Sequence, residues 1–326
     1  MGFIRSIITV YISSEEGAIM QQNQQKDSSR VGFIYGFIAY GVWGFLPLYW
    51  KLLNEVAPFE ILAHRIVWSF FYVMAILVFQ RKGHELKETM SNKDTMVRIM
   101  ISAGLVTINW GLFIWAVNSN YVIETSMGYY INPLIVILLG LLVLKERLSI
   151  WQIISLLFAA VGVLILTMQY GKIPWISLGL ASSFALYGFS KKITKVSSLV
   201  GLALETMILM PFALGYILLR QGQGMGVIGI ISIKTTILLL CSGVATATPL
   251  LWFAKATKRI PLSSMGFLQY ISPTITLFLG VFIFKENFTK IHFISFGFIW
   301  CGLIVYSLSQ IGLLKNIQSK TVKNDY

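Results

Sequence analysis

The sequence predicts an all-α integral membrane protein with ten transmembrane helices in two inverted five-helix repeats. Three observations lead to this prediction: a very apolar composition, recurring apolar runs of similar length, and a long-range internal repeat. Of the 326 residues, 56% are hydrophobic and only 12% are charged, whereas a soluble protein carries about a quarter charged residues. We therefore expect this chain in a lipid bilayer, where helices satisfy their own backbone hydrogen bonds.

The apolar runs each have about the length of a helix that crosses a bilayer. Short links join them, and the longest internal link, residues 80–97, is charged and polar. We expect spans at residues 31–50, 58–79, 98–117, 121–144, 150–169, 174–192, 198–219, 235–254, 262–284 and 289–310.

The internal repeat relates the two halves of the chain at an offset of 140 residues. Pro133 corresponds to Pro273 and Gly162 corresponds to Gly302. Because each half holds an odd number of spans, the second half must be inverted relative to the first. The predicted organisation is a cytoplasmic tail at 1–30, a first repeat at 31–170, a second repeat at 171–310 and a cytoplasmic tail at 311–326.

The distribution of positive charge predicts the orientation. With both termini inside the cell, inner segments hold roughly three times as many Lys and Arg residues as outer ones, as the positive-inside rule requires. The pair Lys145-Glu146 then lies inside, while its repeat, Lys285-Glu286, lies outside. Since the pair recurs on both sides, we expect it to serve the turn at the end of a helix and not the topology.

Polar side chains inside the spans are the candidate functional residues. An Arg within a span costs several kcal/mol unless it is paired or hydrated, so it faces a partner or a cavity. Arg65 has Glu60 and Glu124 at similar predicted depth, and a purely structural link through Glu124 is as well supported as a role in binding. The binding or coupling candidates are His64, Arg65, Asn109, Trp110, Glu124, Tyr130, Asn132, Glu205, Gln269 and Tyr270.

Glu205 differs from the other acids because its own span offers it no neighbouring charge. It lies roughly 10 Å deeper than Arg65 along the membrane normal, by about 1.5 Å per helical residue, so a fixed pair with Arg65 is not expected. A carboxyl group in this position suits a proton carrier. Pro133 and Pro273, at equivalent positions of the halves, predict paired helix bends beside the transport pathway.

The sequence carries no signal for a metal, a cofactor or a nucleotide. Cys241 and Cys301 each lie within an apolar run and match no metal-ligand spacing. The segment 224–229 fits G-x-G-x-x-G, but no strand precedes it and no acidic residue follows at the spacing that binds a ribose. No P-loop sequence is present. The basic excess fits inner loops better than nucleic acid.

Several motifs together resemble those of a known family. They include 63–71 (AHRIVWSFF), 113–118 (FIWAVN), 128–134 (GYYINPL), 205–207 (ETM) and 269–271 (QYI). With the ten spans, this set is similar to the RarD-type permeases of the EamA family, within the drug/metabolite transporter superfamily. The resemblance covers about residues 31–310 and implies a permease of the bacterial inner membrane.

The predicted function is secondary transport, with export the expected direction. Its solutes would be small metabolites or drug-like molecules, moved by alternating access with protons as a candidate coupling ion. Two alternatives stay open. A membrane-embedded enzyme acting on lipid would need a cluster of acids or histidines, and a receptor or scaffold would move no solute at all.

Overall fold

The computed structural model describes residues 2–119, 121–171, 173–227, 232–283, 285 and 289–310. The expectations for the tail 311–326 and for Glu286 lie outside this part. The elements are α1 (Gly2–Lys51), α2 (Pro58–Phe79), α3 (Gly83–Ser91), α4 (Lys93–Asn118), α5 (Val122–Leu142), α6 (Ile150–Tyr170), α7 (Trp175–Ile193), α8 (Ser198–Gly222), α9 (Ile233–Thr257), α10 (Leu262–Gln269), α11 (Ile271–Phe278), the π-helical turn η1 (Leu279–Ile283) and α12 (Lys290–Gln310).

The helices form one bundle, and nine stretches of the described chain are long and apolar enough to cross a membrane. In the last repeat, α10, α11 and η1 together make one such stretch. The long helix α7 is less apolar than these nine and packs against α4 and α5. The predicted class, an all-helical membrane protein, is confirmed.

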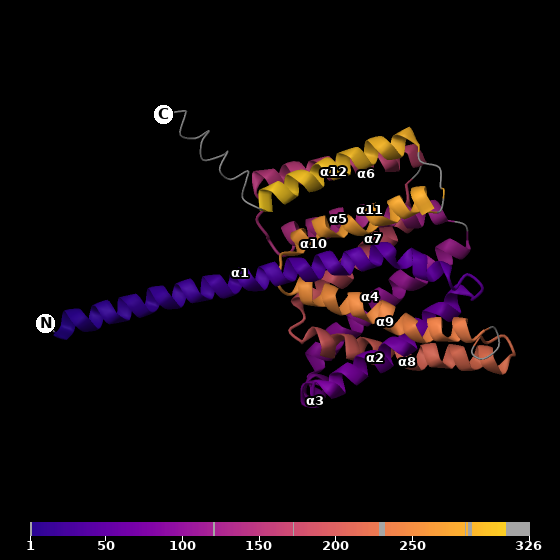
Figure 1. Ribbon diagram of the computed structural model, residues 1–326, viewed down its shortest axis with the longest axis horizontal. Coiled ribbons are helices and arrows are strands. Elements are labelled where there is room, and N and C mark those ends of the chain that lie inside the picture. Colours follow the sequence, from indigo (N-terminus) through magenta and orange to yellow (C-terminus); the bar gives the residue numbers. More distant parts are fainter. Residues whose placement is uncertain are drawn as a thin grey trace.

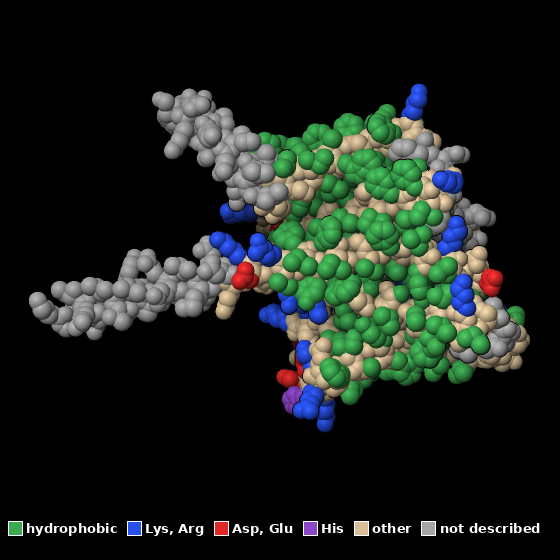
Figure 2. Space-filling view, viewed as in Figure 1, with side chains coloured by type: hydrophobic (Ala, Val, Ile, Leu, Met, Phe, Trp, Pro, Cys, Tyr) green, Lys and Arg blue, Asp and Glu red, His purple; other side chains and the backbone are tan. Residues whose placement is uncertain are grey.

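A belt of apolar side chains covers the outside of the bundle. Figure 2 shows it as a continuous band between two ends that carry the Lys and Arg residues. Met168 and Phe212 illustrate it, since these residues are 80% and 77% exposed. Large apolar groups on such a surface are stable only when lipid replaces water around them.

Helix α1 is longer than the span predicted for it. It runs without a break from the N-terminal segment into the membrane and projects beyond the bundle (Figure 1). We use this projection to name the end of the bundle from which α1 emerges the tail face. The short helix α3, within the charged link 80–97, also lies at the tail face (Figure 1) and was not predicted.

The main packing contacts join helices of one half to helices of the other. Helix α2 packs on α8, α5 packs on α10, and α6 packs on α12. Each of these pairs joins positions that the internal repeat makes equivalent. Contacts of α1 with α9 and of α4 with α7 form another equivalent set. The packing therefore follows the sequence repeat.

The α6–α12 contact shows this relation at the level of atoms. A Cβ atom added to Gly162 would lie 2.5 Å from the carbonyl oxygen of Ser295, and one added to Gly302 would lie 2.7 Å from that of Ser155. Residues 155 and 295 are separated by the same 140 positions as the two glycines. Small residues of this kind let two membrane helices approach closely.

The turn after α5 uses the repeated Lys-Glu pair as expected. Lys145 and Lys285 both adopt a left-handed backbone, with φ of 54° and 58°. Glu146 then reaches the start of α10, where its carboxylate accepts hydrogen bonds from the backbone amides of Leu262 (2.7 Å) and Ser263 (2.9 Å). An acid at a helix N-terminus is favourable, so this residue ties the end of α5 to α10.

The two proline helices differ from one another. Helix α5 is continuous through Pro133, whereas the expected single helix over 262–284 is divided into α10 and α11 at Tyr270, three residues before Pro273. The carbonyl oxygen of Pro133 lies against Gly266 of α10, at 2.7 Å from an added Cβ. The sequence could not show this difference because the interruption begins ahead of the proline.

Candidate functional site

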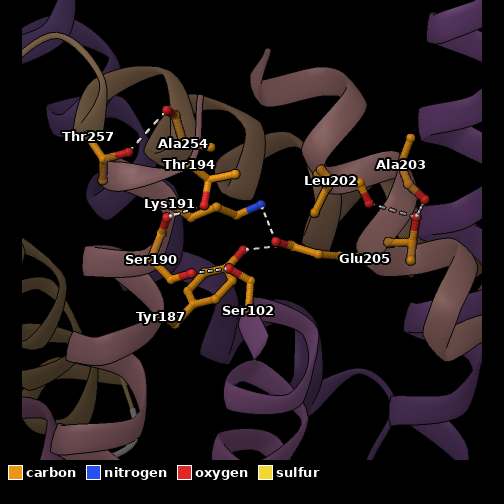
Figure 3. Close-up of polar contacts among 11 residues, drawn as sticks. Ser102, Tyr187, Ser190, Lys191, Thr194, Leu202, Ala203, Glu205, Ala254 and Thr257 are labelled. Carbon is orange, nitrogen blue, oxygen red and sulfur yellow. Dashed lines mark hydrogen bonds and ion pairs between the residues drawn. The ribbon is translucent and has the colours of Figure 1, made fainter. Parts of the chain in front are cut away.

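The centre of the candidate site is a buried ion pair between α7 and α8. The Lys191 Nζ atom lies 2.6 Å from Glu205 Oε1, and the two side chains are only 6% and 3% exposed. The Tyr187 hydroxyl donates a hydrogen bond to the other carboxylate oxygen of Glu205, at 3.2 Å. Figure 3 shows the three side chains converging on one point.

The α7 side of this site is ordered by helical spacing. Tyr187 and Lys191 are four residues apart and so share one face of the helix. The Tyr187 ring stacks on Phe253 of α9, with ring planes at 10° and centroids 6.1 Å apart. One turn along, Ser190 shares a hydrogen bond of 2.6 Å with Ser102 of α4. These contacts fix α7 against its neighbours and hold Lys191 toward Glu205.

Glu205 separates two pockets. The first, toward the tail face, is lined by Lys191, Ser197 and Lys258 as well as Glu205. The second lies deeper and is lined by Trp110 and Thr246 together with Glu205. Because Glu205 lines both, it lies between the two pockets.

Charged groups continue from the ion pair to the tail face. Lys258 follows α9 directly, and partial burial together with the nearby Lys191 lowers its pKa to about 8. Glu85 of α3 accepts a hydrogen bond from the amide of Ser197, at 3.3 Å, just ahead of α8. The first pocket is thus bordered by groups of both signs.

Arg65 occupies the deeper part of the site. Its guanidinium carbon lies 4.6 Å from the centre of the Trp50 ring and 5.3 Å from that of Trp110. Its Nε atom donates a hydrogen bond of 2.9 Å to Thr246 Oγ1. Trp110 and Thr246 also line the deeper pocket, so the surroundings of Arg65 and those of Glu205 meet there. As expected, the described residues form no ion pair between the two.

The expected link between Arg65 and Glu124 is wrong. The Glu124 carboxylate accepts hydrogen bonds from the Tyr170 hydroxyl (2.5 Å) and from the amide of Ile176 (3.1 Å), at the start of α7. It therefore joins α5, α6 and α7 and caps a helix, whereas Arg65 contacts side chains of α1, α4 and α9. The sequence places the two residues at similar depth but does not show that their partners differ.

Asn132 and Gln269 meet between the two halves. The Gln269 amide donates to the Asn132 side chain, which in turn donates to the carbonyl of Ala181 in α7. The hydroxyl of Tyr270 donates to the carbonyl oxygen of Tyr130, at 3.3 Å. All four candidates thus belong to the α5–α10 contact, and each half contributes two of them.

The remaining candidates have local partners. Asn109 of α4 donates to the Leu180 carbonyl (2.9 Å) and to Ser183 Oγ (3.0 Å) of α7. His64 is fully buried and accepts a hydrogen bond from Trp68, one turn further along α2, at 3.2 Å. In the part of the chain that the structure describes, no three His, Cys, Asp or Glu residues are grouped as a metal site would need.

Two residues of the site were missed by the sequence reasoning. Lys191 is absent from the predicted candidates because it lies at the end of the predicted span 174–192, but the structure places it in α7 and buries it. The available signal was Glu205. A carboxylate within a span that has no charged neighbour in the same span requires a cation on a neighbouring helix. Thr246 carried no signal, because a lone Thr in an apolar helix is ordinary.

Comparison with known proteins identifies relatives over most of the chain. The sequence profile described as the EamA-like transporter family matches twice, at residues 30–168 and 173–308. The chain is 44% identical to "Uncharacterized transporter YojE" of Bacillus subtilis (strain 168), over 88% of this chain and 97% of that protein. It is 41% identical to "Protein RarD" of Streptomyces exfoliatus, over 86% and 89% respectively.

The fold is also similar to that of a solved structure. A crystal structure matches with a TM-score of 0.63 and 18% sequence identity, over 85% of this chain and 97% of that one. At this identity the match concerns the helix arrangement alone.

Proposed function

This chain belongs to the EamA-like transporter family, and on that premise we propose that it is a proton-coupled secondary transporter that exports small metabolites or drug-like solutes. We further propose ten spans in two inverted halves, with both termini in the cytoplasm and the tail face as the cytoplasmic face. The observation that carries the proposal is the position of Glu205, which pairs with Lys191 and lines two pockets.

The inverted arrangement is supported by the reciprocal contact of α6 and α12. Gly162 and Gly302 each meet a backbone carbonyl of the other helix, at residues related by the repeat. The family profile also matches once in each half. Two related halves packed face to face can rock about the layer between them, which is the usual basis of alternating access.

The proposed proton step takes place on Glu205. In the observed state its ionised carboxylate pairs with Lys191 and closes the deeper pocket toward the tail face. A proton that reaches Oε1 from the first pocket neutralises the carboxylate and ends the ion pair. Lys191 then faces the first pocket, whose polar lining includes Ser197. Separation of α7 from α8 would open the deeper pocket to the cytoplasm.

Lys258 supports a proton route on this side. Its pKa of about 8 is close enough to cytoplasmic pH for the amine to exchange protons readily. It lines the same pocket as Lys191 and Glu205. A group of this kind, outside the span and beside the pair, can deliver a proton without exposing Glu205 to bulk water.

The test is solute flux in liposomes that contain only this protein. A solute found by a thermal-shift screen is loaded, and an imposed pH gradient drives its movement. We expect Glu205→Gln to abolish the pH-driven flux and to keep solute exchange at equal pH. Glu124→Gln is the matched control, since it neutralises a buried carboxylate that lines neither pocket.

Three results would count against the proposal. A pH response of Glu205→Gln equal to that of the wild type would remove the proton role of this residue. The absence of flux for every solute that binds would favour a receptor, and chemical change of the solute or of the lipid would favour an enzyme.

A further inference from the structure

We propose that Arg65 is the anchor for a solute carboxylate, so that the transported solutes are organic monoanions with an apolar or aromatic body. This inference rests on the proposed transport function and adds the chemical class of the solute. Four observations carry it: the surroundings of the guanidinium, its missing counter-ion, its free donors and the pocket beside it.

The guanidinium lies between two indole rings at 4.6 and 5.3 Å, those of Trp50 in α1 and Trp110 in α4. Contacts of a cation with aromatic faces are favourable. An Arg within a span is nevertheless costly unless it is paired or hydrated. The rings carry no net charge, so they offset only part of the cost of this position.

A carboxylate would offset the rest, but the described residues supply none. Their ion pairs within 4 Å are Lys82–Glu85, His84–Glu88, Lys191–Glu205 and Lys192–Glu146. The two acids predicted as partners of Arg65 have other partners in the structure. Glu124 caps α7, and Glu60 lies near the start of α2, toward Arg220 and the amide of Val227.

The donors of Arg65 are also largely unused. In the described part of the chain its only hydrogen bond goes from Nε to Thr246 Oγ1. The Nη atoms carry four further N–H donors, and they are not among the buried polar atoms that lack a partner. They therefore face accessible space. Nε fixed by Thr246 leaves one planar edge of the guanidinium for a ligand.

The lining of the adjacent pocket indicates the chemistry of the rest of the ligand. Beside Trp110 and Thr246 it is lined by apolar side chains, among them Val106, Leu209 and Leu250, and on another side by the polar side chains of Tyr187, Glu205 and Thr206. A planar guanidinium binds a carboxylate through two parallel hydrogen bonds. Such a ligand would place its carboxylate on Arg65 and its apolar body along the rings and this lining.

The test is binding to the purified full chain in detergent, by calorimetry and by thermal shift. The probes are benzoate and indole-3-acetate, each with its neutral amide, benzamide and indole-3-acetamide. We expect the acids to bind the wild type about tenfold or more tightly than the amides, because only the acids form a charge-assisted contact. This comparison needs no variant.

Variants then assign the contact to Arg65. Arg65→Gln should lose the preference for acids. Arg65→Lys should keep only part of it, because Lys lacks the planar pair of N–H donors that binds both carboxylate oxygens. Arg220→Gln, at the end of α8, is the matched control and should keep the preference. If Arg65→Gln does not fold, Thr246→Val replaces it, since it leaves the cation in place but frees its Nε atom.

Each contrary outcome has a distinct meaning. Equal binding of acids and amides, binding of neither, or an intact preference in a folded Arg65→Gln protein overturns this inference. Acid binding without any flux in liposomes would leave it standing and would instead overturn the transport proposal. Flux of a neutral solute without acid binding would do the reverse.

Discussion

Alanine at Gly162 or Gly302 should loosen the contact between α6 and α12. An added methyl group at these positions would lie 2.5 and 2.7 Å from backbone carbonyl oxygens of Ser295 and Ser155. A carbonyl oxygen in a helix cannot swing away as a side chain can, so the helices must move apart. Overpacking of this kind costs about 1–3 kcal/mol.

The expected loss is somewhat smaller than this cost, because alanine favours a helix over glycine by about 0.5–1 kcal/mol. Each variant should therefore lose about 1–2 kcal/mol and melt a few degrees below the wild type. The double variant should lose less stability than the sum of the two single losses, because the helix separation forced by one methyl group makes room for the other.

The assay is thermal melting of the purified protein in detergent, followed by loss of the monodisperse peak. Gly297→Ala is the matched control, because it lies in α12 between the same loops but has nothing within 4 Å of an added Cβ. It should melt at or above the wild-type temperature. Wild-type melting of both contact variants, or an equal loss in Gly297→Ala, would refute the reciprocal contact.

Three further predictions follow from other features. Single cysteines at Lys145 and Lys285, in a background without native cysteines, should react with an impermeant reagent from opposite sides of the membrane; reaction from one side would end the inverted-repeat proposal. Lys191→Met should destabilise the fold by about 3–5 kcal/mol, and Lys191→Met/Glu205→Leu should recover most of that loss; a double variant as unstable as the single one would show that the pair is not the cause. Glu146→Ala should cost about 1–2 kcal/mol through the lost cap of α10, and an unchanged melting temperature would contradict that role.

Much of the fold could be predicted because the patterns that locate its helices lie along the chain itself. Apolar runs of spanning length and a fixed repeat offset locate helices without any knowledge of their contacts. The division at Tyr270 could not be predicted, since it depends on how α10 packs on Pro133 and its neighbours. Helix α3 was hidden within a charged link that has no apolar periodicity.

The candidate site was less accessible to sequence reasoning. The residue types were found, as Arg65, Trp110 and Glu205 all border the deeper pocket or contact its lining. The partners of these residues were not found. The sequence indicates how deep a residue lies along the membrane normal, but it does not indicate which neighbouring helix its side chain faces. That limit explains both the wrong Arg65–Glu124 link and the omission of Lys191.

The polarity of α7 bears on how the protein is made. This helix is less apolar than the nine membrane-length stretches, yet several of its polar groups have partners on helices synthesised before it. Ser177 donates to the Glu124 carbonyl of α5, and Ser190 shares its hydrogen bond with Ser102 of α4. Tyr187 and Lys191 have their partner, Glu205, in the next helix, α8. Several hydrogen-bond partners of α7 are therefore already in the membrane when α7 is inserted. Because the remaining partner, Glu205, lies in α8, α7 and α8 insert most favourably together as a hairpin.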